Sequence, residues 1–196
     1  MDQNEILVHF KSTNALLEGH FQLSSGLHSS QYLQCALALR RPAEADRFGR
    51  AIANKIAEDG LLKQGITAVA SPAIGGLVIG FAVAQAIGAP FIWTERQNGE
   101  MTLRRGFTLA PGERILVVED VITTGGSTRE CIAALEANGG EVVAAASIVD
   151  RSNGVADVGV PRVSLVSMDV ASYSPEDCPL CARGVTINKP GSRTPA

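Results

Sequence analysis

Two adjacent carboxylates, Glu119 and Asp120, stand at the end of an apolar run in this 196-residue chain. The run, residues 115–118, is rich in β-branched side chains, which is typical of a buried strand. Residues 123–127, Thr-Thr-Gly-Gly-Ser, follow as a tight loop, and residues 127–138 have the pattern of a helix. Carboxylates suit sugar hydroxyls or hydrated Mg²⁺, whereas backbone N–H groups at a helix start suit a phosphate. The segment therefore predicts a pocket that combines these two chemistries.

The same segment has a simpler interpretation as an ordinary strand-to-helix turn of an α/β protein. In either interpretation, Ser127 or Thr128 is predicted to cap the helix that follows. Two acids at the end of a buried strand, however, lose solvation energy unless a ligand or a metal ion uses them, which favours a functional role. The sequence contains neither a Gly-x-x-x-x-Gly-Lys-Ser/Thr P-loop nor a Gly-x-Gly-x-x-Gly after a strand, which counts against those two nucleotide-binding motifs.

The elements around this motif are predicted to alternate between strand and helix. Helices at residues 76–87 and 127–138 are expected to connect parallel strands, as in βαβ units. The strands are predicted at residues 66–70, 91–94, 115–119, 142–149 and 163–168. Upstream, we predict helices at residues 4–17 and 42–59, a polar loop at residues 19–29 and a strand at residues 32–39. The chain is thus expected to form an α/β fold, with the tail at residues 174–196 wrapped over the surface or part of a hood.

A polar segment at residues 95–106 joins two of these strands and is too long for a simple turn. It carries Arg96, Arg104 and Arg105, whereas the acidic loop itself contains no cation that could bind a diphosphate. We therefore interpret the segment as a mobile basic lid, with a surface β-hairpin or meander as the alternative.

Composition and charge count against nucleic-acid-binding, membrane-spanning and secreted proteins. The net charge of −3 gives no sign of a nucleic-acid surface. An uncharged stretch at residues 65–93 is interrupted by Pro72 and Pro90 and by glycines, so it is not expected to span a membrane. The N-terminus lacks the basic start and apolar centre of a signal peptide. Four cysteines fit a reducing cytoplasm better than a disulfide scaffold.

The string from Glu119 to Ser127 resembles the phosphoribosyl-diphosphate (PRPP) signature of type I phosphoribosyltransferases. Nearly the whole chain is similar to the orotate phosphoribosyltransferase family, because three further segments match it. These are Gly-His-Phe-Gln-Leu-Ser-Ser-Gly-Leu-His-Ser at residues 19–29, Ser-Pro-Ala-Ile-Gly-Gly at residues 71–76, and Asp150-Arg151. The resemblance implies transfer of a 5-phosphoribosyl group from PRPP to orotate, giving orotidine 5′-monophosphate and pyrophosphate in pyrimidine (UMP) biosynthesis, with Mg²⁺ as the cofactor.

The resemblance also implies an architecture and partners. It implies a single domain, residues 1–196, with a central, mostly parallel sheet flanked by helices. The core would be about residues 41–169, and a small hood would comprise about residues 1–40 and part of 170–196. It further implies a cytoplasmic homodimer whose lid is shared across the interface. The partners would be the substrates PRPP and orotate, with no nucleic acid and no membrane.

Functional residues of the family fall on specific positions of this chain. Asp120 and Arg96 would be catalytic, with Arg96 reaching the diphosphate across the dimer interface. Glu119 and Asp120 would hold the ribose hydroxyls and Mg²⁺, directly or through water. The remaining implied contacts are the pyrophosphate loop, Ala73, Ile74 and Gly75; the orotate site, Thr123, Arg151, Tyr32 and Leu33; and the PRPP site, Arg96, Glu119, Asp120, Val121, Ile122, Thr123, Thr124, Gly125, Gly126 and Ser127.

Three departures from the family pattern concern cationic contacts. Ser24 and Gly75 stand where many members carry Lys. Residues 97–102, Gln-Asn-Gly-Glu-Met-Thr, replace a Lys-x-x-Lys-x-His series. These contacts are therefore expected to be absent or moved, for example to Arg104 and Arg105.

Two other functions fit parts of the sequence. The first is a type I transferase that uses a purine or another base, and the second is a non-catalytic regulator that senses nucleotides or binds RNA. Arg151 and residues 24–29 favour an acidic pyrimidine over a purine, and the acidic net charge counts against the regulator.

Cys178-Pro-Leu-Cys181 has the spacing of a metal knuckle, but a tetrahedral zinc site needs four ligands. The chain has no second Cys-x-x-Cys, and its other two cysteines are isolated and predicted to lie in the core. We therefore expect a reduced structural pair, with a zinc ion shared across a dimer as the alternative. His20 and His28 flank the N-terminal polar loop, where they would either touch substrate or make loop hydrogen bonds.

Overall fold

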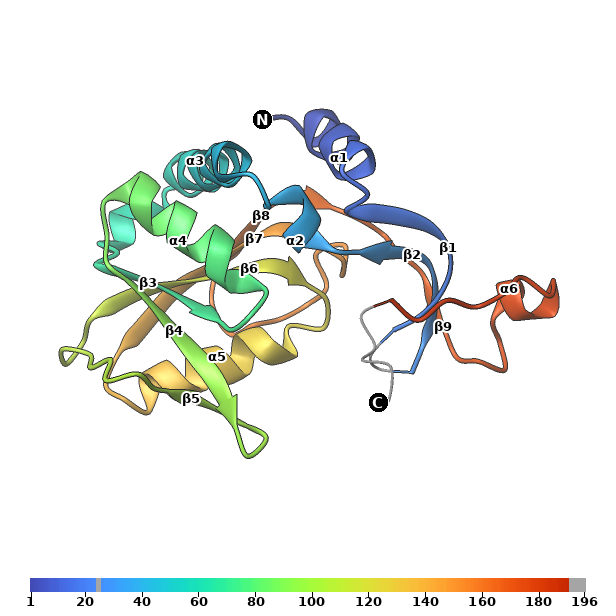
Figure 1. Ribbon diagram of the computed structural model, residues 1–196. Helices are drawn as coiled ribbons and strands as arrows, with labels where there is room; N and C mark the ends of the chain where they lie inside the picture. Colours follow the sequence, from blue (N-terminus) through green and yellow to red (C-terminus); the bar gives the residue numbers. More distant parts are fainter. Residues whose placement is uncertain (24–25, 191–196) are drawn as a thin grey trace.

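Six strands build the central sheet of the protein, for which a computed structural model describes residues 1–23 and 26–190. Their spatial order is β5-β4-β3-β6-β7-β8, and the neighbours are parallel except β4 and β5 (Figure 1). The strands are β3 (Ala68–Pro72), β4 (Phe91–Gln97), β5 (Glu100–Leu103), β6 (Arg114–Ile122), β7 (Glu141–Asp150) and β8 (Arg162–Ser167). The predicted α/β fold with a mostly parallel sheet is confirmed.

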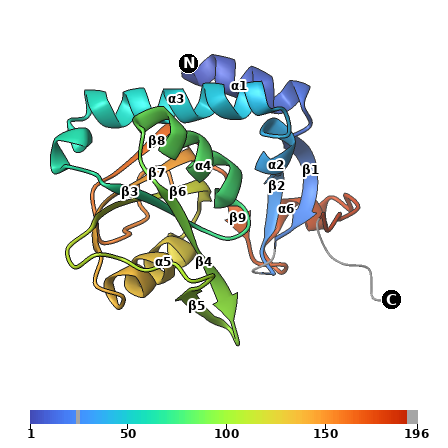
Figure 2. The same ribbon diagram turned by 60° about the vertical axis from the view of Figure 1, so that its left-hand side comes forward.

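Helices cover both faces of this sheet. Helices α3 (Pro42–Glu58) and α4 (Gly76–Ile87) lie on one face and α5 (Gly126–Glu136) on the other, as Figure 2 shows. Helix α4 connects β3 to β4 and α5 connects β6 to β7, which confirms the two predicted βαβ units. Among the described residues, no helix is both long enough and apolar enough to cross a lipid bilayer.

Strand β6 is buried on both of its faces. Leu116 and Val118 belong to the hydrophobic cluster beneath α3 and α4, whereas Ile115 and Val117 belong to the cluster beneath α5. This alternation is the two-residue period of a strand, and helices on both sides explain why the run is continuously apolar. The carboxyl end of β6 therefore emerges between two layers of helices.

A small antiparallel sheet, built from both ends of the chain, lies beside the central sheet (Figure 1). In it β1 (Leu16–Gln22) pairs with β2 (His28–Leu33), which pairs with the two-residue strand β9 (Ser172–Tyr173). The remaining helices are short or terminal: α1 (Gln3–Ser12), α2 (Cys35–Ala38), the 3₁₀ helix η1 (Leu61–Gln64) and α6 (Pro179–Ala182).

The structure differs from the sequence prediction mainly in the first forty residues. The helix predicted at residues 4–17 ends at Ser12, and Asn14 turns the chain with a left-handed φ of 56°. Leu16 and Leu17 then join a strand, because their cross-strand partners are the equally apolar Leu33 and Tyr32.

Two further predictions in this region are also wrong. Most of the predicted loop at residues 19–29 belongs to the strands of the β1–β2 hairpin. Ser24, in the same predicted loop, lies outside the described residues. The predicted strand at residues 32–39 stops at Leu33, after which α2 begins. Pairing between distant segments overrides the local pattern here.

The polar segment at residues 95–106 forms a β-hairpin, which was the alternative to a lid. Strand β4 extends to Gln97 and pairs with β5. Asn98 and Gly99 at the turn both have positive φ, 54° and 91°. Asn-Gly in this conformation is a preferred two-residue hairpin turn, which explains why the segment is ordered.

The strand order reverses between β3 and β6. From β3 the chain continues into β4 on one side, and it later returns to β6 on the other side of β3. In open α/β sheets the loops at such a point diverge and leave a crevice at the carboxyl ends of the strands. Here those loops are residues 73–75 and residues 123–125, which places both predicted ligand loops at this crevice.

The loop between β6 and α5 depends on Gly125, which occupies the position before the helix. Its φ is 75°, and a Cβ there would lie 2.8 Å from Cγ1 of Val158. No described side chain caps the helix, so the prediction that Ser127 or Thr128 does so is wrong. The helix starts at Gly126, and Thr128 instead donates a hydrogen bond to Glu119.

Replacing Gly125 with Ala should lower the free energy of unfolding by about 1–3 kcal/mol, because the new Cβ meets both an unfavourable φ and Val158. Gly126→Ala is the matched control, since a Cβ there would find its nearest neighbour, Thr124 Oγ1, at 3.6 Å. Urea denaturation of both variants measures the difference. Equal losses in the two variants would contradict the role given to Gly125.

Candidate functional site

Glu119 and Asp120 lie within strand β6 rather than after it, because the strand continues to Ile122. Glu119 is only 8% exposed, and its Oε1 accepts a hydrogen bond of 2.6 Å from Oγ1 of Thr128. Asp120 is partly buried, and its Oδ1 accepts a hydrogen bond of 2.9 Å from the backbone N–H of Val121. The two partners are neutral, so neither carboxylate gains an opposite charge from these contacts.

This environment raises the pKa of both acids. Burial raises the pKa of Glu119 to about 7; the hydrogen bond from Thr128 acts against this shift and the charge of Asp120 adds to it. Burial likewise raises the pKa of Asp120, opposed by the hydrogen bond from Val121. A cation or a set of hydroxyl donors placed beside the pair would favour the ionised forms, and hard oxygen ligands of this kind suit Mg²⁺.

A polar pocket of about 230 Å³ lies where β6 meets α5. Its walls are the loop and the first turn of the helix, whose backbone N–H groups and positive dipole end suit an anion. The pocket has the size and polarity for a phosphate group. The residues that line it are Arg96, Glu119, Val121, Ile122, Thr123, Thr124, Gly125, Gly126, Ser127, Thr128 and Glu130.

Arg96 is the hairpin arginine that lines this pocket. Its guanidinium forms an ion pair with Glu130 and donates a hydrogen bond of 2.8 Å to the backbone oxygen of Gly99. Arg96 therefore stands at the pocket of its own chain, with an acidic partner that an incoming phosphate could replace.

The other two hairpin arginines are held by Glu95. Arg105 Nε lies 2.6 Å from Glu95 Oε1, and Arg104 lies 3.5 Å from Oε2. The hydrogen bonds from Arg105 and then from Trp93 lower the pKa of Glu95 to about 2. Arg104 and Arg105 are therefore paired within the hairpin in this conformation.

A second, larger pocket of about 1170 Å³ adjoins the first. Thr123 and Thr124 line both pockets, so the two meet at the start of the β6–α5 loop. One wall comes from the small sheet and the C-terminal segment, and the other from the loop after β7. The lining residues are Gln22, Leu23, Leu27, Tyr32, Thr123, Thr124, Arg129, Arg151, Ser152, Val155, Ala156, Asp157, Val170, Ser172, Lys189 and Pro190.

Arg151 is the cation of this pocket that the sequence singled out. Its Nε is buried and has no hydrogen-bond partner among the described residues, and burial lowers the pKa of the guanidinium. Such a group is costly to leave unpaired, so it favours an acidic ligand. Lys189, in contrast, was missed, because nothing in its local sequence indicates that the tail reaches this pocket.

The loop that presents Arg151 is fixed by its neighbour Asp150. Asp150 accepts hydrogen bonds from Ser152 and from the N–H of Gly154, and it pairs with Arg162 at 2.9 Å. Burial acts to raise the pKa of Asp150, but the contacts of Ser152, Arg162 and Gly154 outweigh it and the pKa is lowered. Asp150 is thus an ionised anchor for the loop.

The remaining predicted residues lie on nearby elements. Ala73, Ile74 and Gly75 form the β3–α4 loop, and the Ala73–Ile74 peptide is cis. A Cβ on Gly75 would lie 2.8 Å from Oδ1 of Asp120, so this loop packs directly against the acid pair. Leu33, unlike Tyr32, packs against the larger hydrophobic cluster.

The buried position of Glu119 should make the protein less stable as pH rises. Its carboxyl group has an ordinary pKa of 4.5 and a folded value of about 7, so between these values the folded state holds a proton that the unfolded state releases. The resulting stabilisation is complete below the lower value, is lost as pH approaches 7 and stays lost above it. The full difference is roughly 3 kcal/mol.

Glu119→Gln should remove this dependence, because the amide does not ionise. Urea denaturation in metal-free buffer at about pH 5 and about pH 8 measures it for the wild type and the variant. The exposed Glu136→Gln on α5 is the matched control. An identical pH profile in wild type and Glu119→Gln would refute the burial argument.

Known proteins match this chain along nearly its whole length. Residues 38–175 match the phosphoribosyl transferase domain family. The protein named orotate phosphoribosyltransferase of Pelotomaculum thermopropionicum is 50% identical over 193 residues, which cover 98% of this chain and 99% of that protein. The protein of the same name from Heliobacterium modesticaldum is 48% identical over 197 residues, which cover 99% of this chain and 100% of the relative.

The fold agrees with these sequence matches. The crystal structure of orotate phosphoribosyltransferase from Aeropyrum pernix has a TM-score of 0.64 and 27% identity to this chain. The likeness covers 83% of this chain and 93% of that structure. The sequence is about 50% identical to these relatives over nearly the full length of the chain, and the fold is shared. This chain therefore belongs to the phosphoribosyltransferases and, among them, to the orotate phosphoribosyltransferase family.

Proposed function

We propose that this protein transfers the 5-phosphoribosyl group from PRPP to orotate, giving orotidine 5′-monophosphate and pyrophosphate in UMP biosynthesis. The observation that carries the proposal is the junction of the two pockets at Thr123 and Thr124. A ribose at this junction would have its phosphate in the polar pocket and its C1′ facing the larger one. Membership of the orotate phosphoribosyltransferase family supports the same assignment.

The 5′-phosphate of PRPP would occupy the polar pocket. Backbone N–H groups from Thr123 to Ser127 would donate to it, and the start of α5 would stabilise its charge. Val121 and Ile122 complete the wall next to the acids. The ribose hydroxyls would then face Glu119 and Asp120.

Glu119 and Asp120 would also hold Mg²⁺, through ribose hydroxyls or water. The donor set fits this ion, because two adjacent carboxylates with raised pKa values and neutral hydrogen-bond partners lack a compensating charge. When bound, Mg²⁺ would neutralise part of the charge of the diphosphate leaving group.

Orotate would bind in the larger pocket with its carboxylate toward Arg151. The unpaired, buried Nε of Arg151 is the group in this pocket that gains most from a carboxylate partner. Thr123 and the backbone near Tyr32 and Leu33 would orient the ring. A purine would leave Arg151 without its anionic partner, which is why we favour orotate.

Cleavage of the bond between C1′ and pyrophosphate makes the ribose more positive and the leaving group more negative. Arg96 would break its ion pair with Glu130 and pair with the diphosphate instead. The loop Ala73, Ile74 and Gly75 would contact the opposite side of the diphosphate. Asp120 would orient the ribose for attack by N1 of orotate. Because orotate is already an anion, the main contributions of the protein are positioning, charge stabilisation and exclusion of water.

We further propose a homodimer whose β4–β5 hairpin is shared across the interface. Ile74, Val78 and Phe81, which are 83%, 48% and 60% exposed, lie on or next to α4 beside the pyrophosphate loop. A second copy of the chain would cover this apolar surface. In such a dimer the Arg96 of one copy would leave Glu130 and the polar pocket of its own chain and reach the diphosphate bound by the other copy.

The division into a core at about residues 41–169 and a hood at about residues 1–40 and part of 170–196 belongs to the same proposal. The small sheet β1-β2-β9 supports it, because Gln22, Tyr32 and Ser172 contribute to the larger pocket from one side. We place the reaction in the cytoplasm, since none of the four cysteines forms a disulfide, which fits a reducing compartment.

Asp120→Asn should lower kcat more than tenfold, equivalent to about 1.4 kcal/mol or more of activation free energy, because the variant loses the charge beside the ribose. The assay follows the loss of orotate absorbance on addition of PRPP and Mg²⁺. Adenine, guanine and uracil are tested in parallel, and the partly exposed Asp46→Asn on α3 is the matched control. Turnover of a purine but not of orotate by the wild type would overturn the proposed function.

Arg151→Gln should raise KM for orotate by about tenfold to a hundredfold, the effect of losing one hydrogen bond between charged groups. The KM for PRPP should change far less, because Arg151 lines only the larger of the two described pockets. Steady-state kinetics with each substrate varied separately measures both constants. The surface variant Arg50→Gln controls for the loss of a positive charge, and an unchanged KM for orotate would exclude Arg151 from the base site.

A further inference from the structure

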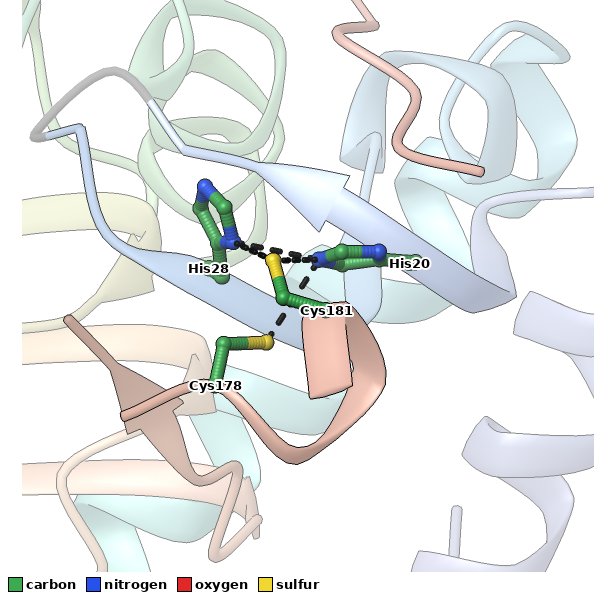
Figure 3. A group of neighbouring side chains, drawn as sticks. All are labelled: His20, His28, Cys178 and Cys181. Carbon is green, nitrogen blue, oxygen red and sulfur yellow. Dashed lines mark hydrogen bonds between the residues drawn. The ribbon is translucent and has the colours of Figure 1, made fainter. Parts of the chain in front are cut away.

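Four potential metal ligands from distant parts of the chain meet at one end of the small sheet. His20 comes from β1, His28 from β2, Cys181 from α6 and Cys178 from the position just before α6. Their ligating atoms all lie within 4.8 Å of one another. Figure 3 shows the four side chains pointing toward a common centre.

The spacing of these atoms matches a tetrahedral zinc site. With Zn–N near 2.0–2.1 Å and Zn–S near 2.3 Å, tetrahedral angles separate two nitrogens by about 3.4 Å and a nitrogen from a sulfur by about 3.6 Å. The two imidazoles approach at 3.1 Å, His20 Nε2 to His28 Nδ1. Three of the four nitrogen–sulfur distances are 3.3 Å, 3.5 Å and 3.7 Å, and the fourth, between Cys178 and His28, is within 4.8 Å.

The protonation of His20 is also the one that a metal requires. Its Nδ1 lies 2.7 Å from the backbone oxygen of Val185, which can only accept, so Nδ1 carries the proton. In the neutral ring Nε2 then presents a lone pair to the centre of the cluster. A backbone carbonyl that fixes the tautomer of a ligating histidine in this way is the usual outer contact of a metal site.

Hydrogen bonding alone satisfies this cluster poorly. Nε2 of His20 faces His28 Nδ1 and both sulfur atoms, yet one lone pair accepts one well-directed hydrogen bond. His20, His28 and Cys178 are 1%, 6% and 2% exposed, so water can reach the cluster mainly from the side of Cys181, which is exposed. A cation at the centre would use all four lone pairs at once.

We propose that His20, His28, Cys178 and Cys181 bind one Zn²⁺ ion, which fastens the C-terminal segment to the β1–β2 hairpin. Two thiolates and two imidazoles in a tetrahedral arrangement select zinc over oxygen-preferring cations such as Mg²⁺. Binding releases the two thiol protons. All four ligands come from one chain, so the ion does not need to be shared across a dimer.

The ion would strengthen the attachment of the C-terminal segment to the small sheet. The C-terminal segment, residues 172–190, is joined to the small sheet by the two-residue strand β9, by an isolated bridge between Phe21 and Asn188, and by single side-chain contacts such as that of His20 with Val185. Helix α6 has four residues, of which no side chain is buried. Coordination by Cys178 and Cys181 would fix this segment, in the way that structural zinc ions replace a missing hydrophobic core.

Metal content tests the proposal directly. The full-length protein, purified under reducing conditions from zinc-supplemented cells, should contain about one zinc per chain by elemental mass spectrometry. Cys178→Ser, Cys181→Ser and His28→Gln should each lose most of this zinc. Cys131→Ala and His9→Gln, which remove a thiol and an imidazole outside the cluster, should retain it.

Cobalt provides a readout that does not depend on the variants remaining folded. Titration of metal-depleted, reduced wild type with Co²⁺ should produce the visible absorption bands of a tetrahedral ion with thiolate ligands, saturate near one equivalent and disappear on addition of Zn²⁺. Circular dichroism of each variant separates loss of metal from loss of fold. A wild-type protein without zinc that also gives no cobalt spectrum would overturn the proposal, as would full zinc content in Cys178→Ser.

Discussion

The structure depends on keeping two carboxyl groups in a poorly solvated position at the carboxyl end of β6. Burial is the main cause that raises the pKa of Glu119 to about 7, and its hydrogen-bond partner Thr128 is neutral. The position is created by helices on both faces of the sheet and by the reversal of strand order beside β3. The fold therefore holds two ionisable groups where a bound ligand or cation would compensate their charge, which supports the proposal that the active site lies at this edge of the sheet.

The two pockets are related through the same short loop. Thr123 and Thr124 belong to both, and Gly125 lets the loop turn tightly into α5. A shift of this loop would consequently change both pockets together. The buried acids, the helix start and Arg151 are mounted on strand ends rather than on long loops, which suits a reaction that relies on positioning.

The sequence predicted the central sheet and the acidic loop well because their signals are local. Residues 115–118 form one continuous apolar run, and the helix at residues 76–87 has the predicted bounds. The N-terminal hairpin was missed because Leu16 and Leu17 continue the apolar spacing of α1, while their strand partners lie further along the chain. The helix cap was missed because Thr128 has a partner, Glu119, that only tertiary structure reveals.

Part of the candidate site could also be predicted from the sequence, and part of it could not. The acidic motif and Arg151 could be named from the sequence and its resemblance, and their individual roles stay predictions. The contribution of Lys189 could not be named, because local spacing carries no information on where a tail folds back. The same holds for the histidines, since His20 and Cys178 are 158 residues apart in sequence. Cys178 and Cys181 alone indicated half of a metal site.

The larger pocket takes its walls from opposite ends of the polypeptide, with Tyr32 on one strand and Pro190 near the C-terminus. During synthesis the central sheet and the phosphate-sized pocket can form as soon as β8 has emerged, whereas this wall must wait for the last part of the chain. A growing or clipped polypeptide would thus pass through a stage in which one half of the crevice is built and the other stands open to water. Closure of the larger pocket therefore requires the chain at least as far as Pro190.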